Sequence, residues 1–322
     1  MNLLQTLPWA VPGVNDAFFD LSYVLQLVTT GLANGAVYAL MALSVVIVYR
    51  TTGHMNFAQG EMGTIGCLLV FSISVERGVP YWISIPAAIA LSMVVGAVLQ
   101  RTLVQPVERR GGMGVVLVTL GLFLIINAVD AVIWGADPVT PVTPFPSEAG
   151  DRFIILDGPP QFAIRYSTIG IWITLAVVVG LLWLLLQRTR LGLGYRAVAA
   201  NPESALLVGI PKDRMLMLGW ALAAGIGTLA AVLFSQKTGS LDFNLMAAVI
   251  LYGLAAAALG GFDSIPGAVV GGAVVGLVES LVPAFFSFIG SELSLVMALV
   301  VIVAVLLVRP QGIFGKAKVV RV

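Results

Sequence analysis

The sequence predicts an all-α integral membrane protein with about nine transmembrane helices. Hydrophobic residues make up 59 % of the chain and charged residues 10 %, with a mean hydropathy of +1.02. A soluble domain has about 25 % charged residues. Nine apolar segments have roughly the length that crosses the hydrocarbon core of a bilayer, and the basic residues gather in alternate loops. We therefore expect one transmembrane domain over residues 1–322.

The apolar segments follow one another along the chain with short polar loops between them. Phe57–Val75 contains three glycines and Leu245–Leu259 is short, so each is compatible with a broken or re-entrant helix. The expected number of spans is therefore eight to ten. The segments are Val24–Tyr49, Phe57–Val75, Tyr81–Gln100, Val115–Trp134, Thr168–Leu186, Leu216–Ser235, Leu245–Leu259, Ile265–Pro283 and Leu293–Val308.

The basic residues predict the orientation of the chain. With the N-terminus outside and alternating spans, thirteen of the 17 Lys and Arg residues fall in inside loops and four fall outside. Cytoplasmic loops carry an excess of basic residues, so this arrangement is favoured over its reverse. We expect the N-terminus outside and the C-terminus in the cytoplasm. Residues 1–21 lack a basic start and contain two aspartates, which does not fit a cleaved signal peptide.

Two loops differ from the rest. Residues 135–167, expected outside, contain six prolines and a pattern typical of a β-hairpin around Asp157 and Gly158. This loop suits either a rigid connector or part of a docking surface for an extracytoplasmic protein. Residues 187–215, expected in the cytoplasm, carry five basic and two acidic residues.

The cytoplasmic loop 187–215 also contains helix-end signals. Asn201 suits an N-cap, Pro202 suits the first helical position, and Gly209 suits the residue just past a helix end. The segment between them offers an apolar surface through Ala205, Leu206 and Val208. A short helical element outside the membrane predicts a docking site for a partner protein.

Polar side chains within apolar segments are costly in lipid and are therefore candidates for a solute path. Hydrogen bonding between helices is the alternative role. Asn56 and Gln59 also fit a capping box, whereas Glu61 lies one turn deeper. The candidate path residues are Asn34, Asn56, Gln59, Glu61, Asn127 and Asp130.

The sequence contains no motif for nucleotide chemistry or metal binding. A phosphate-binding G-x-x-x-x-G-K-[ST] loop does not occur. His54 is the one histidine and Cys67 the one cysteine, so neither a catalytic triad nor a metal site is expected. No basic stripe suggests nucleic-acid binding.

Three stretches resemble the permease family of branched-chain amino acid ABC importers. They are RAVAANPESALLVGI (residues 196–210), NFAQGE (residues 56–61) and LGGFDSIPGAVVGG (residues 259–272), and GLANGAVYALMALSVVIVY (residues 31–49) agrees as well. The resemblance extends from about Gly31 to Phe314. Gln59 departs from the pattern, since many relatives have His there. The resemblance implies that the loop 187–215 contacts an ATPase through Arg196, Ala197, Ala200, Asn201, Pro202, Ala205, Gly209 and Ile210.

The resemblance also implies the assembly around this chain. The expected fold is that of vitamin B12-type and ribose-type importers, in a bacterial inner membrane. Expected partners are a second related permease, two cytoplasmic ATPases that hold ATP and Mg²⁺, and an extracytoplasmic binding protein. Expected substrates are branched-chain or other hydrophobic amino acids, with urea or short amides as the alternative. A stand-alone secondary transporter or channel is the rival from another class, although it would need an ionisable relay at mid-membrane.

Overall fold

The computed structural model describes residues 21–110, 113–148, 150–156, 161–285, 293–309 and 311–315. The turn expected at Asp157 and Gly158 lies outside these residues, as does most of the N-terminal stretch 1–21. The described chain is mostly helical, and every one of the nine apolar segments contains a helix.

The elements follow in this order: α1 Leu21–Thr52, α2 Gln59–Phe71, η3 Ser72–Glu76, α3 Tyr81–Leu99, η4 Gln100–Val104, α4 Gln105–Glu108, α5 Met113–Trp134, β1 Arg152–Leu156, β2 Phe162–Arg165, α6 Tyr166–Arg188, α7 Arg190–Ala200, α8 Pro202–Leu207, α9 Lys212–Thr238, α10 Ala247–Gly260, α11 Ile265–Phe285 and α12 Ser294–Val308. The η elements are π-helical turns that continue the preceding helix.

Six helices in the described part of the chain are long and apolar enough to cross a membrane. They are the helices at Leu21–Thr52, Tyr81–Glu108, Gly114–Trp134, Tyr166–Arg188, Lys212–Thr238 and Ile265–Phe285. The other three apolar segments form shorter or more polar helices. With 14 residues, α10 is about 21 Å long, which is less than the hydrocarbon core of a bilayer. The count of nine complete spans therefore remains a prediction.

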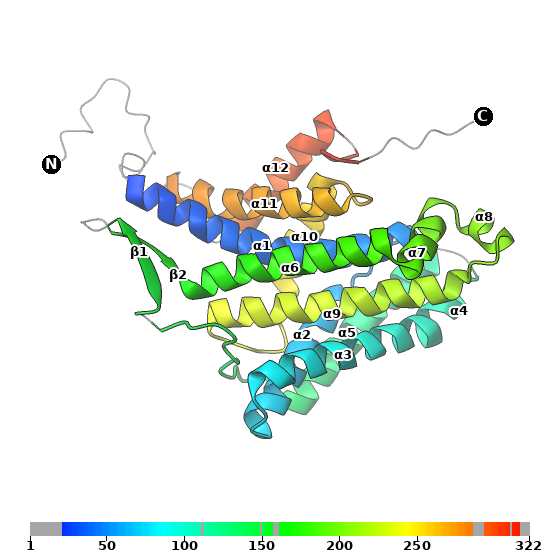
Figure 1. Cartoon of the computed structure of the whole chain (residues 1–322), viewed down its shortest axis with the longest axis horizontal. Helices are drawn as coiled ribbons and strands as arrows, with labels where there is room; N and C mark the ends of the chain where they lie inside the picture. Colours follow the sequence, from blue (N-terminus) through cyan, green and yellow to red (C-terminus); the bar gives the residue numbers. More distant parts are fainter. Residues whose placement is uncertain are drawn as a thin grey trace.

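Two helices, α1 and α9, form the centre of the bundle. Of their most apolar windows, 89 % and 78 % of the residues are buried, against 28 % or less for α3, α5, α6 and α11. Helices α2 and α3 pack against α9, while α10 and α11 pack against α1. The long helices run in roughly the same direction in Figure 1. The outer helices present exposed apolar side chains such as Leu117, Leu124 and Val132 on α5, as a lipid-facing surface requires.

Helices α1 and α11 touch through their backbones. A Cβ atom added at Gly35 would lie 2.7 Å from the carbonyl oxygen of Gly272, and one at Gly31 would lie 2.9 Å from that of Gly276. Small residues permit such close approach, which is the main source of helix association in lipid. The glycines of α11 therefore have a packing role.

A two-stranded antiparallel hairpin, β1 and β2, lies at one end of the bundle (Figure 1). The proline-rich segment before it is tied to the end of α9. Val139 and Leu241 form a β-bridge, and the side chain of Gln236 donates a 2.7 Å hydrogen bond to the carbonyl of Phe145. These contacts favour a rigid connector and leave the exposed strand β1 at the surface.

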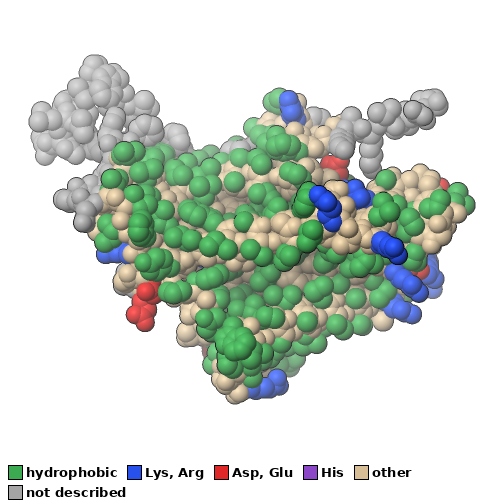
Figure 2. All heavy atoms as spheres, viewed as in Figure 1, with side chains coloured by type: hydrophobic (Ala, Val, Ile, Leu, Met, Phe, Trp, Pro, Cys, Tyr) green, Lys and Arg blue, Asp and Glu red, His purple; other side chains and the backbone are tan. Residues whose placement is uncertain are grey.

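Helices α4, α7 and α8 lie at the opposite end of the bundle from the hairpin (Figure 1). Lys and Arg side chains also gather at that end, over α4 and α7, as Figure 2 shows. The side of the molecule seen between the two ends is largely hydrophobic. The bundle therefore has one basic end and a broad apolar belt.

Candidate functional site: a helical elbow and buried polar clusters

The loop 187–215 folds into two short helices, α7 and α8, which we call the elbow. Thr189 caps α7 by accepting a 3.0 Å hydrogen bond from the Gly192 amide. Asn201 caps α8 by accepting a 2.9 Å hydrogen bond from the Ser204 amide, and Pro202 is the first helical residue. Gly209 has φ +80°, where only glycine is unstrained. The local geometry thus follows the helix-end signals of the sequence.

The exposed surface of α8 differs from the expected one. Ala205 is only 3 % exposed and packs within the chain, so the expectation that it offers an outward surface is wrong. Leu206 and Val208 are 54 % and 73 % exposed, as expected, and Leu207, which was not expected, is 88 % exposed. The reason is helical periodicity: Ala205 lies on the face of α8 that turns back to the chain. Three large apolar side chains outside the spans form a surface that suits a protein partner.

Some of the other elbow residues are buried in the chain and others are exposed. Arg196 is partly buried, and its Nη1 donates a 2.8 Å hydrogen bond to Oε1 of Gln187, so part of its guanidinium is used within the chain. Ala200 and Asn201 are exposed, while Ala197, Pro202 and Ile210 are partly buried. Tyr195 and Val198 are fully buried and anchor α7 to the bundle.

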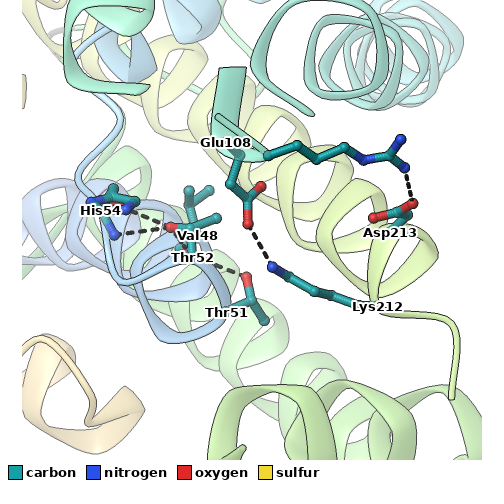
Figure 3. Close-up of polar contacts among 8 residues, drawn as sticks. Val48, Thr51, Thr52, His54, Glu108, Lys212 and Asp213 are labelled. Carbon is teal, nitrogen blue, oxygen red and sulfur yellow. Dashed lines mark hydrogen bonds and ion pairs between the residues drawn. The ribbon is translucent and has the colours of Figure 1, made fainter. Parts of the chain in front are cut away.

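Two ion pairs join α4 to the start of α9, directly after the elbow (Figure 3). The Lys212 Nζ atom lies 2.9 Å from Oε1 of Glu108, and Arg109 Nη2 lies 2.7 Å from Oδ2 of Asp213. The first pair is largely buried and the second is exposed. Nearby, Thr52 closes the end of α1 by donating to Val48 and accepting from the main chain of His54. The chain that leaves the elbow is therefore tied to α4.

The six candidate path residues fall into three separate places. Asn56 and Gln59 form one pair, in which Asn56 donates a 3.1 Å hydrogen bond to Gln59. The predicted capping box does not form. Helix α2 begins at Gln59, and Asn56 instead accepts a hydrogen bond from the Ala58 amide in the preceding turn. Gln59 donates a 2.9 Å bond to the carbonyl of Ala223 on α9. This pair is used in helix packing.

Glu61, Asn127 and Asp130 form the second place, which we call the carboxylate cluster. Nδ2 of Asn127 lies 3.4 Å from Oε2 of Glu61, 3.2 Å from the carbonyl oxygen of Phe243 and 3.1 Å from Oδ1 of Asn244. Glu61 and Asp130 are both 0 % exposed, and Asn127, which lies beside Glu61, precedes Asp130 by about one turn on α5. The cluster joins α2, α5 and the loop between α9 and α10.

Asn34 lies in the third place, between α1 and α11. Its Nδ2 and the hydroxyl of Tyr38 each donate a 2.8 Å hydrogen bond to Oε2 of Glu279. The ring of Tyr38 stacks on that of Tyr252 at a centroid distance of 4.6 Å. Tyr38 and Tyr252 were not candidates from the sequence, although Tyr38 follows Asn34 by one helical turn and shares its face.

The sequence that forms these helices matches a known protein family. The family described as "Branched-chain amino acid transport system / permease component" matches residues 27–306. The chain belongs to this family. The match covers the central helices, the carboxylate cluster and the elbow.

Individual relatives of the permease family align over nearly their whole lengths. The chain is 28 % identical to the high-affinity branched-chain amino acid transport system permease protein LivH of Escherichia coli, over 93 % of this chain and 98 % of that protein. It is 29 % identical to the corresponding protein BraD of Pseudomonas aeruginosa, over 94 % and 99 %. Among solved structures, PsaBC from Streptococcus pneumoniae in complex with Fab covers 88 % of this chain and 91 % of its own, with 11 % identity and a TM-score of 0.46.

Family membership and the apolar helices together establish the location of the chain. It is a multi-pass protein of the bacterial inner membrane, of the branched-chain amino acid transport permease family.

Proposed function

We propose that this chain is a membrane permease subunit of an ATP-binding cassette importer that carries branched-chain or other hydrophobic amino acids inward. The family match over residues 27–306 is the observation that carries the proposal. Relatives aligned over almost the whole chain bear names of this function. Urea or short amides are less favoured as substrates, since none of these names points to them.

The elbow is the proposed contact with a cytoplasmic ATPase. Its residues Leu206, Leu207 and Val208 project from an end rich in Lys and Arg, which favours the cytoplasmic side. We therefore place the N-terminus outside and the C-terminus inside. The eight elbow residues expected from the sequence act in two ways in this proposal: Arg196, Ala197 and Ala205 support α8 from within, while Ala200, Asn201, Pro202, Gly209 and Ile210 shape the surface that surrounds the three apolar side chains.

The remaining partners complete the proposed assembly. Two ATPases would hold ATP and Mg²⁺, because the sequence itself contains no phosphate-binding loop. A second, related permease would pair with this chain. An extracytoplasmic binding protein would dock at the end that carries β1 and β2. The fold would be that of vitamin B12-type and ribose-type importers, with nine spans.

The proposed solute path runs past the buried polar groups. Glu61, Asn127 and Asp130 would line it together, and Asn34 would line it at about mid-depth of α1. Asn56 and Gln59 would support the path indirectly, since both are engaged in packing α2 against α9.

Co-purification tests the proposal. The tagged chain is solubilised from its native membrane, and the proteins that remain bound are identified. ATPase subunits and a second permease are expected, together with ATP hydrolysis that requires Mg²⁺. Recovery of the chain alone, in a form that transports leucine without ATP, would instead favour a stand-alone transporter.

The same purification with Leu207→Arg locates the ATPase contact. Leu207 is 88 % exposed, so the charge should not disturb the chain itself. The variant should reach the membrane at the normal level but lose most of the bound ATPase. Leu207→Met, which keeps the apolar surface, should retain it.

A further inference from the structure

The carboxylate cluster has more acceptors than its own donors can satisfy. The side-chain amide of Asn127 has two N–H groups, yet three oxygen atoms, from Glu61, Phe243 and Asn244, lie within 3.4 Å of its nitrogen. Oε1 of Glu61 and both side-chain oxygens of Asp130 are buried without any hydrogen-bond partner. Three buried carboxylate oxygens are thus without a hydrogen-bond donor.

The unused oxygens are not neutralised by a neighbouring basic residue. The described residues contain two ion pairs, and both lie at the elbow end of the bundle, on α4 and α9. Glu61 on α2 and Asp130 on α5 are both 0 % exposed, and neither belongs to either of these ion pairs. A buried carboxylate without a donor is strongly unfavourable, so a cation that occupies this position would relieve the cost.

The number and kind of free ligands point to an ammonium group. A divalent ion such as Ca²⁺ takes six to eight oxygen ligands, several of them carboxylate, and no group of three or more His, Cys, Asp or Glu side chains that could hold a metal ion is found among the described residues. A primary ammonium group has three N–H donors. Three carboxylate oxygens lack a donor here.

The cluster is also open on one side. Asn127 is only partly buried, and Asn244 is exposed in the loop between α9 and α10. That loop carries Leu241, which pairs with Val139 of the proline-rich segment, so it lies at the hairpin end. A solute arriving from that end would meet Asn244 first and the two acids behind it.

We propose that Glu61 and Asp130, together with the carbonyl oxygens of Phe243 and Asn244, bind the ammonium group of the transported amino acid. This proposal rests on the proposed function for the identity of the solute. In this proposal the carboxylate cluster recognises the ammonium group. A fatty acid or a neutral amide lacks this group, so the cluster would favour an amino acid.

Binding competition tests the assignment. The chain, with whatever partners co-purify, is placed in nanodiscs without binding protein, and bound radiolabelled leucine is measured. Isoamylamine carries the ammonium group alone and should displace leucine. 4-Methylpentanoate carries the carboxylate alone and should displace it poorly. Displacement by 4-methylpentanoate but not by isoamylamine would overturn the proposal, as would the absence of any isoamylamine-sensitive leucine binding.

Variants of Glu61 and Asp130 test whether these two residues are responsible for the displacement of leucine by isoamylamine. Glu61→Gln and Asp130→Asn keep side-chain size and should each weaken the effect of isoamylamine at least about tenfold, as expected for the loss of a charge-assisted hydrogen bond. The double variant should abolish it. Glu76→Gln, at an exposed position on the same continuous helix, should leave it unchanged. Isoamylamine binding that stays within about twofold of wild type in the double variant would refute the site.

Two controls separate this inference from other failures. NaCl and KCl at the same concentrations should not reproduce the effect of isoamylamine; saturable displacement by Na⁺ that depends on Glu61 and Asp130 would replace the ammonium assignment with an alkali-ion site. ATPase recovery is scored in the same preparations. Normal recovery with unaltered isoamylamine binding in the double variant contradicts the ammonium site alone, whereas missing ATPases in the wild type contradict the proposed function.

Discussion

The hydroxyl of Tyr195 donates a 2.5 Å hydrogen bond to the main-chain carbonyl of Ile47, which joins α7 of the elbow to the central helix α1. The two residues are 148 positions apart and both are buried. Burial raises the pKa of Tyr195 above its ordinary value, and Arg50 nearby opposes this only in part. The phenol therefore keeps its proton and remains a donor. This bond ties the elbow directly to the central helix of the bundle.

Tyr195→Phe should uncouple the elbow from α1. The ring still fills its place, but the carbonyl of Ile47 loses a buried partner, at a cost of about 1–3 kcal/mol. We expect normal membrane levels, a lower unfolding temperature and less transport per ATP hydrolysed. Tyr166→Phe, at a tyrosine that is 45 % exposed, should match the wild type in all three measurements. An unchanged ratio of transport to hydrolysis in Tyr195→Phe would contradict the coupling role.

Ala205→Arg should damage the chain before it damages any partner contact. Ala205 is 3 % exposed, so a bulky charge there must be buried or must displace α8. We expect greater protease sensitivity at residues 200–210 of the purified chain alone. Leu207→Arg, two residues on but outward, should lack this sensitivity. Equal protease patterns for the two variants would show that Ala205 faces away from the rest of the chain.

The glycine contact between α1 and α11 should tolerate no side chain. Gly35→Ala would bring a methyl group to 2.7 Å from the Gly272 carbonyl oxygen, and overpacking of this kind costs about 1–3 kcal/mol. Gly180→Ala on α6 meets no atom within 4 Å and serves as the matched control. We expect a lower thermal midpoint in detergent for Gly35→Ala only. A midpoint equal to that of the control would refute the close approach.

Cysteine labelling should report opposite sides for the two ends of the bundle. The native Cys67 is buried and is replaced by Ala to remove background. Ser147 and Ser204 are both exposed. A cysteine at position 147 should react with an impermeant reagent in intact cells, and one at position 204 only after permeabilisation. The reverse pattern would overturn the orientation drawn from the basic residues.

The two ion pairs between α4 and α9 should contribute differently to the stability of the protein. Exposed pairs contribute at most about 1 kcal/mol, so Arg109→Ala should change little. Lys212→Met leaves Glu108 largely buried without its partner and should cost more. Thermal midpoints of the two variants, measured side by side at low and high salt, decide the matter. A larger loss in Arg109→Ala would contradict this ranking.

Local signals in the sequence predicted the elements well, because they act over a few residues. A helix lies in each of the nine apolar segments, and Asn201, Pro202 and Gly209 mark the ends of α8. The elbow's role and the solute path remain predictions. No local signal revealed that Ala205 packs inward, since its neighbours come from the folded chain.

The sequence identified the polar residues in the helices but not the residues that they contact. Gln59 and Glu61 are neighbours in the sequence, yet residues two apart in a helix point in nearly opposite directions, so Gln59 bonds to α9 while Glu61 meets Asn127. The partner of Asn34, Glu279, lies 245 residues away. Helix periodicity fixes the face on which a residue lies, but the facing helix follows only from the tertiary fold.

The contact between α1 and α11 also has a consequence for how the protein is made. Translation proceeds from the N-terminus, so α1 enters the bilayer long before α11 has been synthesised. Until then its glycine face has no backbone to meet, and Asn34 and Tyr38 have no Glu279 to bond. The central helix α1 is thus inserted well before α11, the helix that its glycine face contacts. It must remain in the membrane incompletely packed until the last quarter of the chain arrives.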